Sequence, residues 1–494
     1  MKLNRNDRCY CGSGKKYKQC HMQEDMAQEK AQKEQEAAEL SAKRLVPPTR
    51  AEFVPLPRFE DDDDDESTDE IESENDDFDR LYTQFEDANY AEKQAILRSA
   101  IEEKSLDNEL AFEFFNDLYS KMIERGEREK FAELVALLQA NLPEVYLHEN
   151  QWFWSWQINN ALALGDEVAL QQGVNQLIAH GGQDLDQFFP MFDCLLYYDC
   201  RKVLLNALAN HQLQIVPGKY FGGVEDEANQ KFADLLVLDY IETHPQNELL
   251  DENNFELLCQ SLARYSPRLL RDRLAEFISW AGGISSRQWT MNDFQFSANS
   301  KRQDRFSDDD DYDDDDDNDD EKQPVNDPAI EHLRNLGYEF LHYARSTEGV
   351  ALTKADLACE HLVKYILARH RDELSDDTRS NRPPGKNRNA KGKPKTAGEK
   401  PQILLPDHKT LDRYLIRFYG FMAHGTYEGA ALFELIPAWT RFLQAKGLVT
   451  AEEGHQALRS LQALSQSMLQ IMENNDVDPA LAVNMRKWRE NAGT

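Results

Sequence analysis

The sequence predicts an all-α protein, and three observations support this class. From residue 78 onward, apolar residues recur at the three- and four-residue spacing that places them on one face of a helix. Turn-forming residues interrupt these periodic segments at Gly126, Gly165 and Asp199. The interruptions lie 39 and 34 residues apart, so short helices recur in pairs.

Pairs of short helices at this spacing are typical of helical-repeat proteins, and the pattern resembles an α-solenoid of the tetratricopeptide type. Because no strict repeat consensus is present, an irregular helical bundle is the alternative. The chain has 494 residues. At roughly 100–200 residues per domain, this length predicts two to four domains.

Composition and periodicity divide the chain into a basic N-terminal element, helical regions and charged linkers. In order, the expected segments are 1–22, the basic element; 23–77, a helical and acidic flexible tether; 78–300, a helical-repeat-like domain; 301–328, an acidic disordered linker; 329–374, a helical hairpin; 375–403, a basic disordered linker; and 404–494, a C-terminal helical domain. The tether begins with good helix formers but has no apolar face with which to dock.

The helical regions carry recognisable apolar faces. One face is expected between Asn108 and Arg125, and Gly126 ends that helix. Its members are Leu110, Phe114, Phe115, Leu118, Tyr119 and Met122. Further helices are expected at 152–164, 168–179, 188–198 and 203–209.

Three of the seven Trp residues lie between 151 and 156. Trp152 and Trp156 share a helix face, and Trp154 points elsewhere. An aromatic groove for a peptide is one interpretation, but a core helix buried on both sides is favoured because buried aromatic residues dominate ordinary cores. Free cysteines pack as small apolar residues. Those in apolar helical segments are therefore expected to be buried thiols, namely Cys194, Cys200, Cys259 and Cys359.

The charge balance is strongly acidic, with 56 Lys and Arg against 90 Asp and Glu and a net charge of −34. Most of this surface repels phosphate backbones, which argues against general nucleic-acid binding. Twelve of the fourteen residues from Asp308 to Glu321 are acidic, but they lack the ligand spacing of a calcium loop. Eight Lys and Arg residues between 379 and 400 either touch RNA or, as we favour, fold back onto the acidic runs.

The chain is expected to be cytoplasmic. No stretch approaches the roughly 18–20 apolar residues that span a bilayer. The first ten residues are polar and basic with no apolar segment behind them, which argues against a secretory signal. In the cytosol free thiols stay reduced, so a disulfide among the N-terminal cysteines is not expected.

The N-terminal element contains Cys9, Cys11, Cys20 and His21 in the spacing C-x-C-x8-C-H. Three thiolates and one imidazole match the tetrahedral donor set that zinc prefers. The neighbouring residues are Lys, Arg, Gly and Ser, which argues against core packing for these side chains. Four protein donors leave no position for water, so we expect one structural Zn²⁺ rather than a catalytic one.

Within R-N-D and G-S-G-K-K-Y-K flanks, this spacing resembles the SEC-C motif, found at the C-terminus of the preprotein translocase ATPase SecA and in other bacterial proteins. Arg8 and Tyr10 stand where the family usually has Pro, and Met22 replaces a common Gly. None of the three is a metal ligand.

In SecA the motif is a basic zinc element that docks on the chaperone SecB. The resemblance implies a protein-docking role for the basic residues Arg5, Arg8, Lys15, Lys16 and Lys18. It therefore implies a bacterial adaptor or scaffold whose partner has an acidic surface, such as a SecB-like chaperone or secretion and quality-control machinery. The same basic element could instead bind the chain's own acidic runs.

Two other functional classes are retained as alternatives. An RNA- or ribosome-associated factor would use the basic element and the 375–403 linker. An enzyme would need a site in the helical regions, but no zinc-protease, nucleophile-elbow, phosphate-loop or dinucleotide motif is present. The pairs Glu331–His332, Glu360–His361 and Asp407–His408 are adjacent in sequence, which places their members on different helix faces. We therefore do not predict catalysis.

Overall fold

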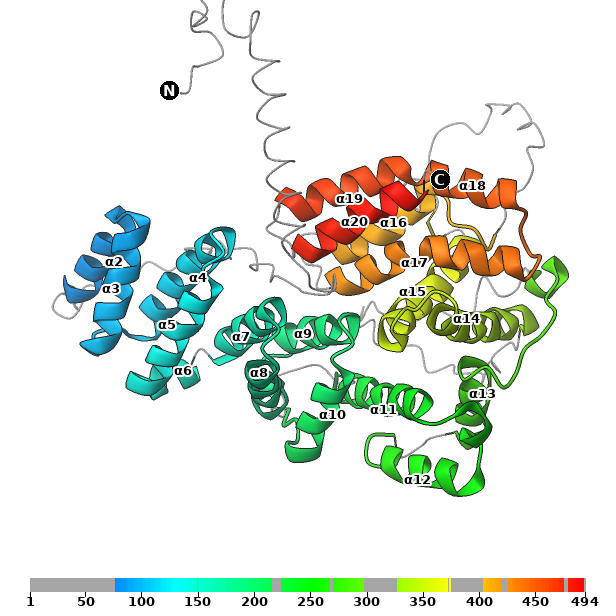
Figure 1. Cartoon of the computed structure of the whole chain (residues 1–494), viewed down its shortest axis with the longest axis horizontal. Helices are drawn as coiled ribbons and strands as arrows, with labels where there is room; N and C mark the ends of the chain where they lie inside the picture. The colour runs from blue at the N-terminus through cyan, green and yellow to red at the C-terminus, as the bar shows by residue number, and fades with distance from the viewer. Residues whose placement is uncertain are drawn as a thin grey trace, which may run out of the picture. The chain divides into compact units, whose positions relative to one another are not determined.

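A computed structural model of the chain describes residues 76–148, 150–215, 224–266, 270–296, 327–371, 373–374, 403–419, 425–474 and 479–492. All of them belong to one compact unit, Arg50–Thr494. These residues form helices joined by short turns, with no strand among them (Figure 1). The predicted all-α class is therefore confirmed for the described part of the chain. No helix found there is both long enough and apolar enough to traverse a bilayer.

The first described helices pack mainly on their near neighbours along the chain. They are α2 (Asp76–Asp87), α3 (Tyr90–Glu102), α4 (Asn108–Glu124), α5 (Arg128–Asn141), α6 (Pro143–His148), α7 (Asn150–Leu164) and α8 (Glu167–His180). This is the packing that helical repeats use.

From α9 onward, helices far apart in the sequence also pack together. The elements of this part are η2 (Gly181–Gln183), α9 (Leu185–Tyr197), α10 (Arg201–Asn210), α11 (Val224–Thr243), η3 (Gln246–Glu248), α12 (Glu252–Leu262), α13 (Arg271–Ala281), η4 (Met291–Phe294), α14 (Pro328–Ser346), α15 (Leu352–His370), α16 (His408–Tyr419), α17 (Thr426–Ala445), α18 (Ala451–Ser460), α19 (Gln462–Asn474) and α20 (Pro479–Ala492). Helix α9 contacts both α15 and α17, and α11 contacts α15. In a simple helical repeat each helix pair contacts only its neighbours along the chain, so these contacts go beyond repeat packing.

The three predicted turns all adopt left-handed backbone conformations. The φ angles are +70° at Gly126, +70° at Gly165 and +52° at Asp199. A left-handed residue after the last helical turn reverses the chain, and Gly does so without a steric penalty. Asp is one of the few other residues that tolerate this region. The predicted ends of α4, α7 and α9 are therefore confirmed.

Helix α7 is shared between two hydrophobic cores. Phe153 and Trp156 are buried in the core formed by α2 to α6. Trp154 and Ile158 are buried in the core that contains α8 to α20. Trp152 is only partly buried. The prediction of a core helix buried on both sides is thus confirmed, and the aromatic residues do not form an open groove.

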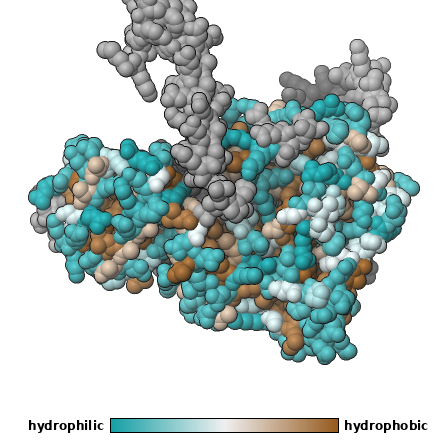
Figure 2. All heavy atoms as spheres, in the orientation of Figure 1, coloured by the Kyte–Doolittle hydropathy of each residue, from teal (hydrophilic) through white to brown (hydrophobic). Residues whose placement is uncertain are grey.

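The buried-thiol prediction is also confirmed, because Cys194, Cys200, Cys259 and Cys359 are all buried thiols outside any disulfide. Hydrophilic residues cover most of the face of the described residues shown in Figure 2. The predicted tether 23–77 and linkers 301–328 and 375–403 lie outside the described residues, except for one or two residues at an end of each.

Helix α8 is expected to depend on its N-cap. The Asp166 side chain accepts hydrogen bonds from the backbone N–H groups of Val168 and Ala169, at 3.1 and 3.0 Å. Replacing Asp166 with alanine should lower the free energy of unfolding by about 1 kcal/mol, because these two N–H groups lose their acceptor. Asp166→Asn, which keeps an acceptor oxygen, should retain most of the stability in the same denaturant titration. Equal losses in the two variants would show that the cap is not the cause.

Candidate functional site

The predicted zinc and docking residues lie outside the described residues. They are the donors Cys9, Cys11, Cys20 and His21 and the basic residues Arg5, Arg8, Lys15, Lys16 and Lys18. Three thiolates with one imidazole are a donor set that zinc takes in closed structural sites, so these residues fit a zinc ion by their chemistry. Within the described residues, no group of three or more His, Cys, Asp or Glu side chains is arranged to hold a metal ion.

The main polar site inside the described helices is a buried ionic cluster, which we define as Asp193, Lys231, His361, Tyr414 and Glu428. The five side chains come from α9, α11, α15, α16 and α17 respectively. Asp193 is 5% exposed and His361 is 8% exposed. Charged groups at this depth must be paired, because an isolated charge is costly to bury.

The cluster is held by a chain of short contacts. Lys231 Nζ donates to Asp193 Oδ1 at 2.7 Å and lies 3.9 Å from Glu428 Oε1. The other carboxylate oxygen of Glu428 is 3.5 Å from His361 Nε2. Tyr414 Oη lies 3.5 Å from His361 Nδ1. One lysine therefore bridges two carboxylates, and the histidine binds the second of them.

Local sequence positions these groups. Glu428 lies in the first turn of α17, where the positive end of the helix dipole favours a carboxylate. Asp193 is the single charged residue in the otherwise apolar stretch from Phe188 to Tyr198. Because that stretch faces the core, the Asp193 carboxylate is buried with it and needs a cation from another helix.

The two carboxyl groups of the cluster differ in proton affinity. Burial, together with the nearby charge of Glu428, raises the pKa of Asp193 to about 7 despite the opposing effect of Lys231. Burial also opposes ionisation of Glu428, but His361 and Lys231 outweigh it and lower the pKa of Glu428 to about 2. For Lys231, burial is outweighed by Asp193 and Glu428, and its pKa is raised. The two carboxyl groups, Asp193 and Glu428, therefore share one proton that titrates near neutral pH.

Three further carboxyl groups face this region from α11 and α15. Burial raises the pKa of Asp234 to about 6, although Gln230 Nε2 donates to its Oδ1 at 2.7 Å. Burial, with Asp234 and Glu360 nearby, raises the pKa of Asp356 well above its usual range. Glu360 is paired with Lys364 at 2.8 Å on the exposed face of α15. The α11–α15 interface thus has more acidic groups than cations to pair with them.

A second polar network ties the same helices together nearby. Tyr197 Oη donates to Glu434 Oε1 at 2.6 Å, and Lys354 Nζ donates to the other oxygen at 2.5 Å. Asn484 on α20 donates to Tyr197 Oη at 3.0 Å. Thr353 Oγ1 also donates to the backbone oxygen of Leu196 at 2.7 Å. Helix α9 is therefore joined to α15, α17 and α20 by specific polar contacts as well as by apolar packing.

The cluster and this network bind helices to one another. In these contacts Asp193 meets Lys231, and Glu428 meets Lys231 and His361. Cys359, the nearby thiol on α15, has a raised pKa because it is buried, and a buried thiol of raised pKa is a poor nucleophile. These contacts join α9, α11, α15 and α17 within the described part of the chain.

Comparison with known families adds one finding. A family model of the SEC-C motif matches residues 5–23. The segment is thus similar to SEC-C motifs, as the spacing of its cysteines and histidine predicts. No curated protein and no solved structure matches the chain.

The sequence did not predict the ionic cluster. It predicted that Glu360 and His361 would occupy different helix faces, and His361 is buried while Glu360 is exposed. The partner of His361, however, is Glu428 on a distant helix. The one available signal was Asp193 itself, a lone carboxylate within an apolar helix.

Proposed function

We propose that this protein is a zinc-binding adaptor, in which the SEC-C segment docks a protein partner and the helices provide a scaffold of helical-repeat type. The observation that carries the proposal is the SEC-C match at residues 5–23, which contains all four expected zinc donors. A peptide this short has no apolar core of its own. Zinc binding would have to supply its folding free energy, on the order of 10–16 kcal/mol for small structural sites.

Charge supports docking on an acidic partner. Residues 1–22 contain six Lys and Arg residues and one Asp, in a chain of net charge −34. A cationic tip on an anionic protein can approach an acidic surface that the remainder of the molecule would repel. An acidic chaperone of the SecB type fits this chemistry, and with such a partner the adaptor would act in protein secretion or quality control. The paired interior charges described above fit binding rather than catalysis.

The test separates zinc binding from docking. The variant Cys9→Ser with Cys11→Ser should lose stoichiometric zinc, measured by metal analysis of purified protein. It should also bind a purified SecB-type chaperone at least about tenfold more weakly, measured by calorimetry. Replacing Lys15, Lys16 and Lys18 with glutamine should keep the zinc and weaken docking by a similar factor.

A matched control is Cys259→Ser, which removes a thiol of the helical part and should leave both zinc and docking unchanged. Wild-type protein without zinc would contradict the metal assignment. Undiminished chaperone binding by the Cys9 and Cys11 variant would contradict the docking role.

The alternative function is an RNA or ribosome contact, favoured by the eight Lys and Arg residues between 379 and 400. Binding of that kind would weaken steeply with salt, in proportion to the phosphates neutralised.

A further inference from the structure

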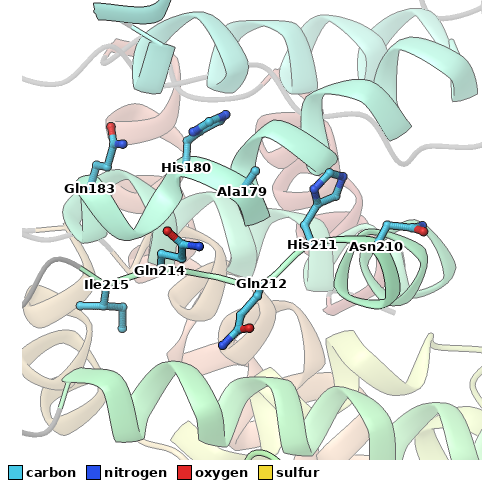
Figure 3. A pocket seen from close by; sticks show the side chains of 8 residues that line it. All are labelled: Ala179, His180, Gln183, Asn210, His211, Gln212, Gln214 and Ile215. Carbon is cyan, nitrogen blue, oxygen red and sulfur yellow. The ribbon is translucent and has the colours of Figure 1, made fainter.

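A cavity of about 570 Å³ lies at the C-terminal ends of two helices, and no residue of the ionic cluster lines it (Figure 3). Its lining residues are Ala179, His180, Gln183, Asn210, His211, Gln212, Gln214 and Ile215. Ala179 and His180 end α8, and Asn210 ends α10. The volume is within the range of roughly 300–1,000 Å³ that holds small ligands or parts of larger ones.

The cavity is lined mainly by polar side chains, two of which are the histidines His180 and His211. None of its lining residues is Asp, Glu, Lys or Arg. The backbone oxygens of Leu208, Ala209 and Asn210, at the end of α10, accept no hydrogen bond from any described residue. Helix C-termini carry partial negative charge and favour cations and N–H donors. The amide oxygens of Gln212 and Gln214 add further acceptors.

Residues 211–215 follow α10 without helical structure, and the backbone N–H of His211 still donates to the backbone oxygen of Ala207 at 2.8 Å. His211 has the β conformation, with φ −131° and ψ 158°. Leu213 and Ile215 pack on the core, whereas Gln212 and Gln214 are exposed. From Gln212 to Ile215, no backbone group is hydrogen-bonded to a described residue. The side chains thus alternate as they would in a β-strand, and the backbone groups of Gln212 to Ile215 are open to a strand added beside them.

Glycine brings this segment against η2. A Cβ atom placed on Gly182 would lie 2.2 Å from the backbone oxygen of Gln214, so only glycine allows the observed approach. The segment is thereby fixed beside the ends of α8 and α10. Its free backbone edge and the acceptor-rich cavity are held next to one another.

We propose that this cavity binds an extended, basic peptide segment of a partner protein. The main chain of the peptide pairs with residues 212–215, and one Arg or Lys side chain enters the cavity to meet the carbonyl oxygens at the end of α10. Strand addition to a free edge is an established mode of peptide recognition. The proposal deepens the adaptor function and rests on it, because it gives the scaffold a binding site of its own, separate from the SEC-C segment.

The test uses the full-length protein and the acetylated, amidated pentapeptide Ala-Thr-Arg-Thr-Ala in calorimetry. We expect saturable binding, at least about tenfold weaker when citrulline replaces arginine, because citrulline keeps the shape and loses the charge. The same peptide methylated at alternate backbone nitrogens should also bind at least about tenfold more weakly, since it loses strand hydrogen bonds. Equal binding of all three peptides, or binding of none, would overturn the proposal.

Protein variants locate the site. Gln214 is exposed, so its substitution should not disturb folding. Gln214→Lys should weaken binding of the arginine peptide about tenfold, and Gln214→Glu should strengthen it, because the two changes place opposite charges in the cavity. Unchanged affinity in both variants would assign the binding to another surface and overturn the proposal.

Two further arms separate this proposal from its alternatives. Replacing the eight Lys and Arg residues between 379 and 400 with glutamine should leave peptide affinity unchanged. A tenfold gain would show that the chain's own basic segment occupies the cavity, and would overturn an external partner. The Cys9→Ser and Cys11→Ser variant should still bind the peptide. This result distinguishes failure of the cavity proposal from failure of zinc-dependent docking.

Discussion

Replacing Trp156 with alanine is expected to lower the free energy of unfolding by about 3–5 kcal/mol. Trp156 is 1% exposed, and its ring lies 5.5 Å from Tyr119, 5.9 Å from Phe131 and 5.6 Å from Phe153, measured between centroids. Truncation removes these aromatic contacts and leaves a cavity that the neighbouring rings can only partly fill. Denaturant unfolding monitored by far-ultraviolet circular dichroism measures the loss.

The position of Trp156 also determines where the damage falls. Because it faces the core of α2 to α6, amide hydrogen exchange should accelerate in α3, α4 and α5 and remain near wild type in α14 to α17. Trp152→Ala is the matched control, since Trp152 lies one turn away and is only partly buried. It should cost about 1 kcal/mol. Equal acceleration of exchange in α14 to α17 would contradict the assignment of Trp156 to the first core.

Helix faces and turns were the part of the fold that sequence periodicity could predict. All six members of the predicted face of α4 are buried, and the helix ends just before Gly126. Both features are local: a helix buries one stripe, and Gly readily adopts the positive φ that ends it. The same local rules located the turns at Gly165 and Asp199. The tetratricopeptide-like order of repeats stays a prediction.

The location of α7 between two cores also followed from its sequence. Its aromatic residues lie on more than one face instead of forming one stripe, and a helix of this kind must be covered on more than one side. Phe153 and Trp156 contact one core, while Trp154 contacts the other. The sequence could thus assign these residues to opposite faces of α7. It could not tell which other helices form the core on each side.

The ionic cluster was beyond such rules because its members come from separate parts of the chain. Asp193 and Lys231 lie 38 residues apart, and Glu428 belongs to a helix near the C-terminus. Periodicity reports which face of a helix is buried and carries no information on which helix it meets. The zinc donors are the opposite case, since all four lie within thirteen consecutive residues and their chemistry can be read locally.

Replacing Lys231 with methionine is expected to cost about 3–5 kcal/mol of stability at pH 8. The lysine side chain is 18% exposed and is the cation between Asp193 and Glu428. Methionine fills much of the same space but leaves two buried carboxylates facing one another. The double variant Lys231→Met with Asp193→Asn should recover most of the loss, because it removes the uncompensated charge. Chemical denaturation of the wild type, the two single variants and the double variant gives the coupling energy between Lys231 and Asp193.

The loss in free energy of unfolding caused by Lys231→Met should be smaller at pH 5 than at pH 8, because Asp193 binds a proton as the pH falls. The pKa of Asp193 is raised to about 7 in the folded protein, against about 3.9 in an unfolded chain. Its contribution to stability is therefore fully present below about pH 4 and is lost as pH rises through about 7. Asp234, with a pKa raised to about 6, acts in the same direction. Glu428, whose pKa is lowered to about 2, is ionised in both states above pH 5 and adds no slope there.

Wild-type stability should consequently fall between pH 5 and pH 8, with at most about 1.4 kcal/mol per pH unit contributed by Asp193. Asp193→Asn should flatten that part of the profile, whereas Glu452→Gln, at an exposed surface pair, should leave it unchanged. Parallel profiles for wild type and Asp193→Asn would show that Asp193 keeps its charge throughout this range. In that case Lys231, and not a shared proton, would be the group that holds α9, α11 and α17 together.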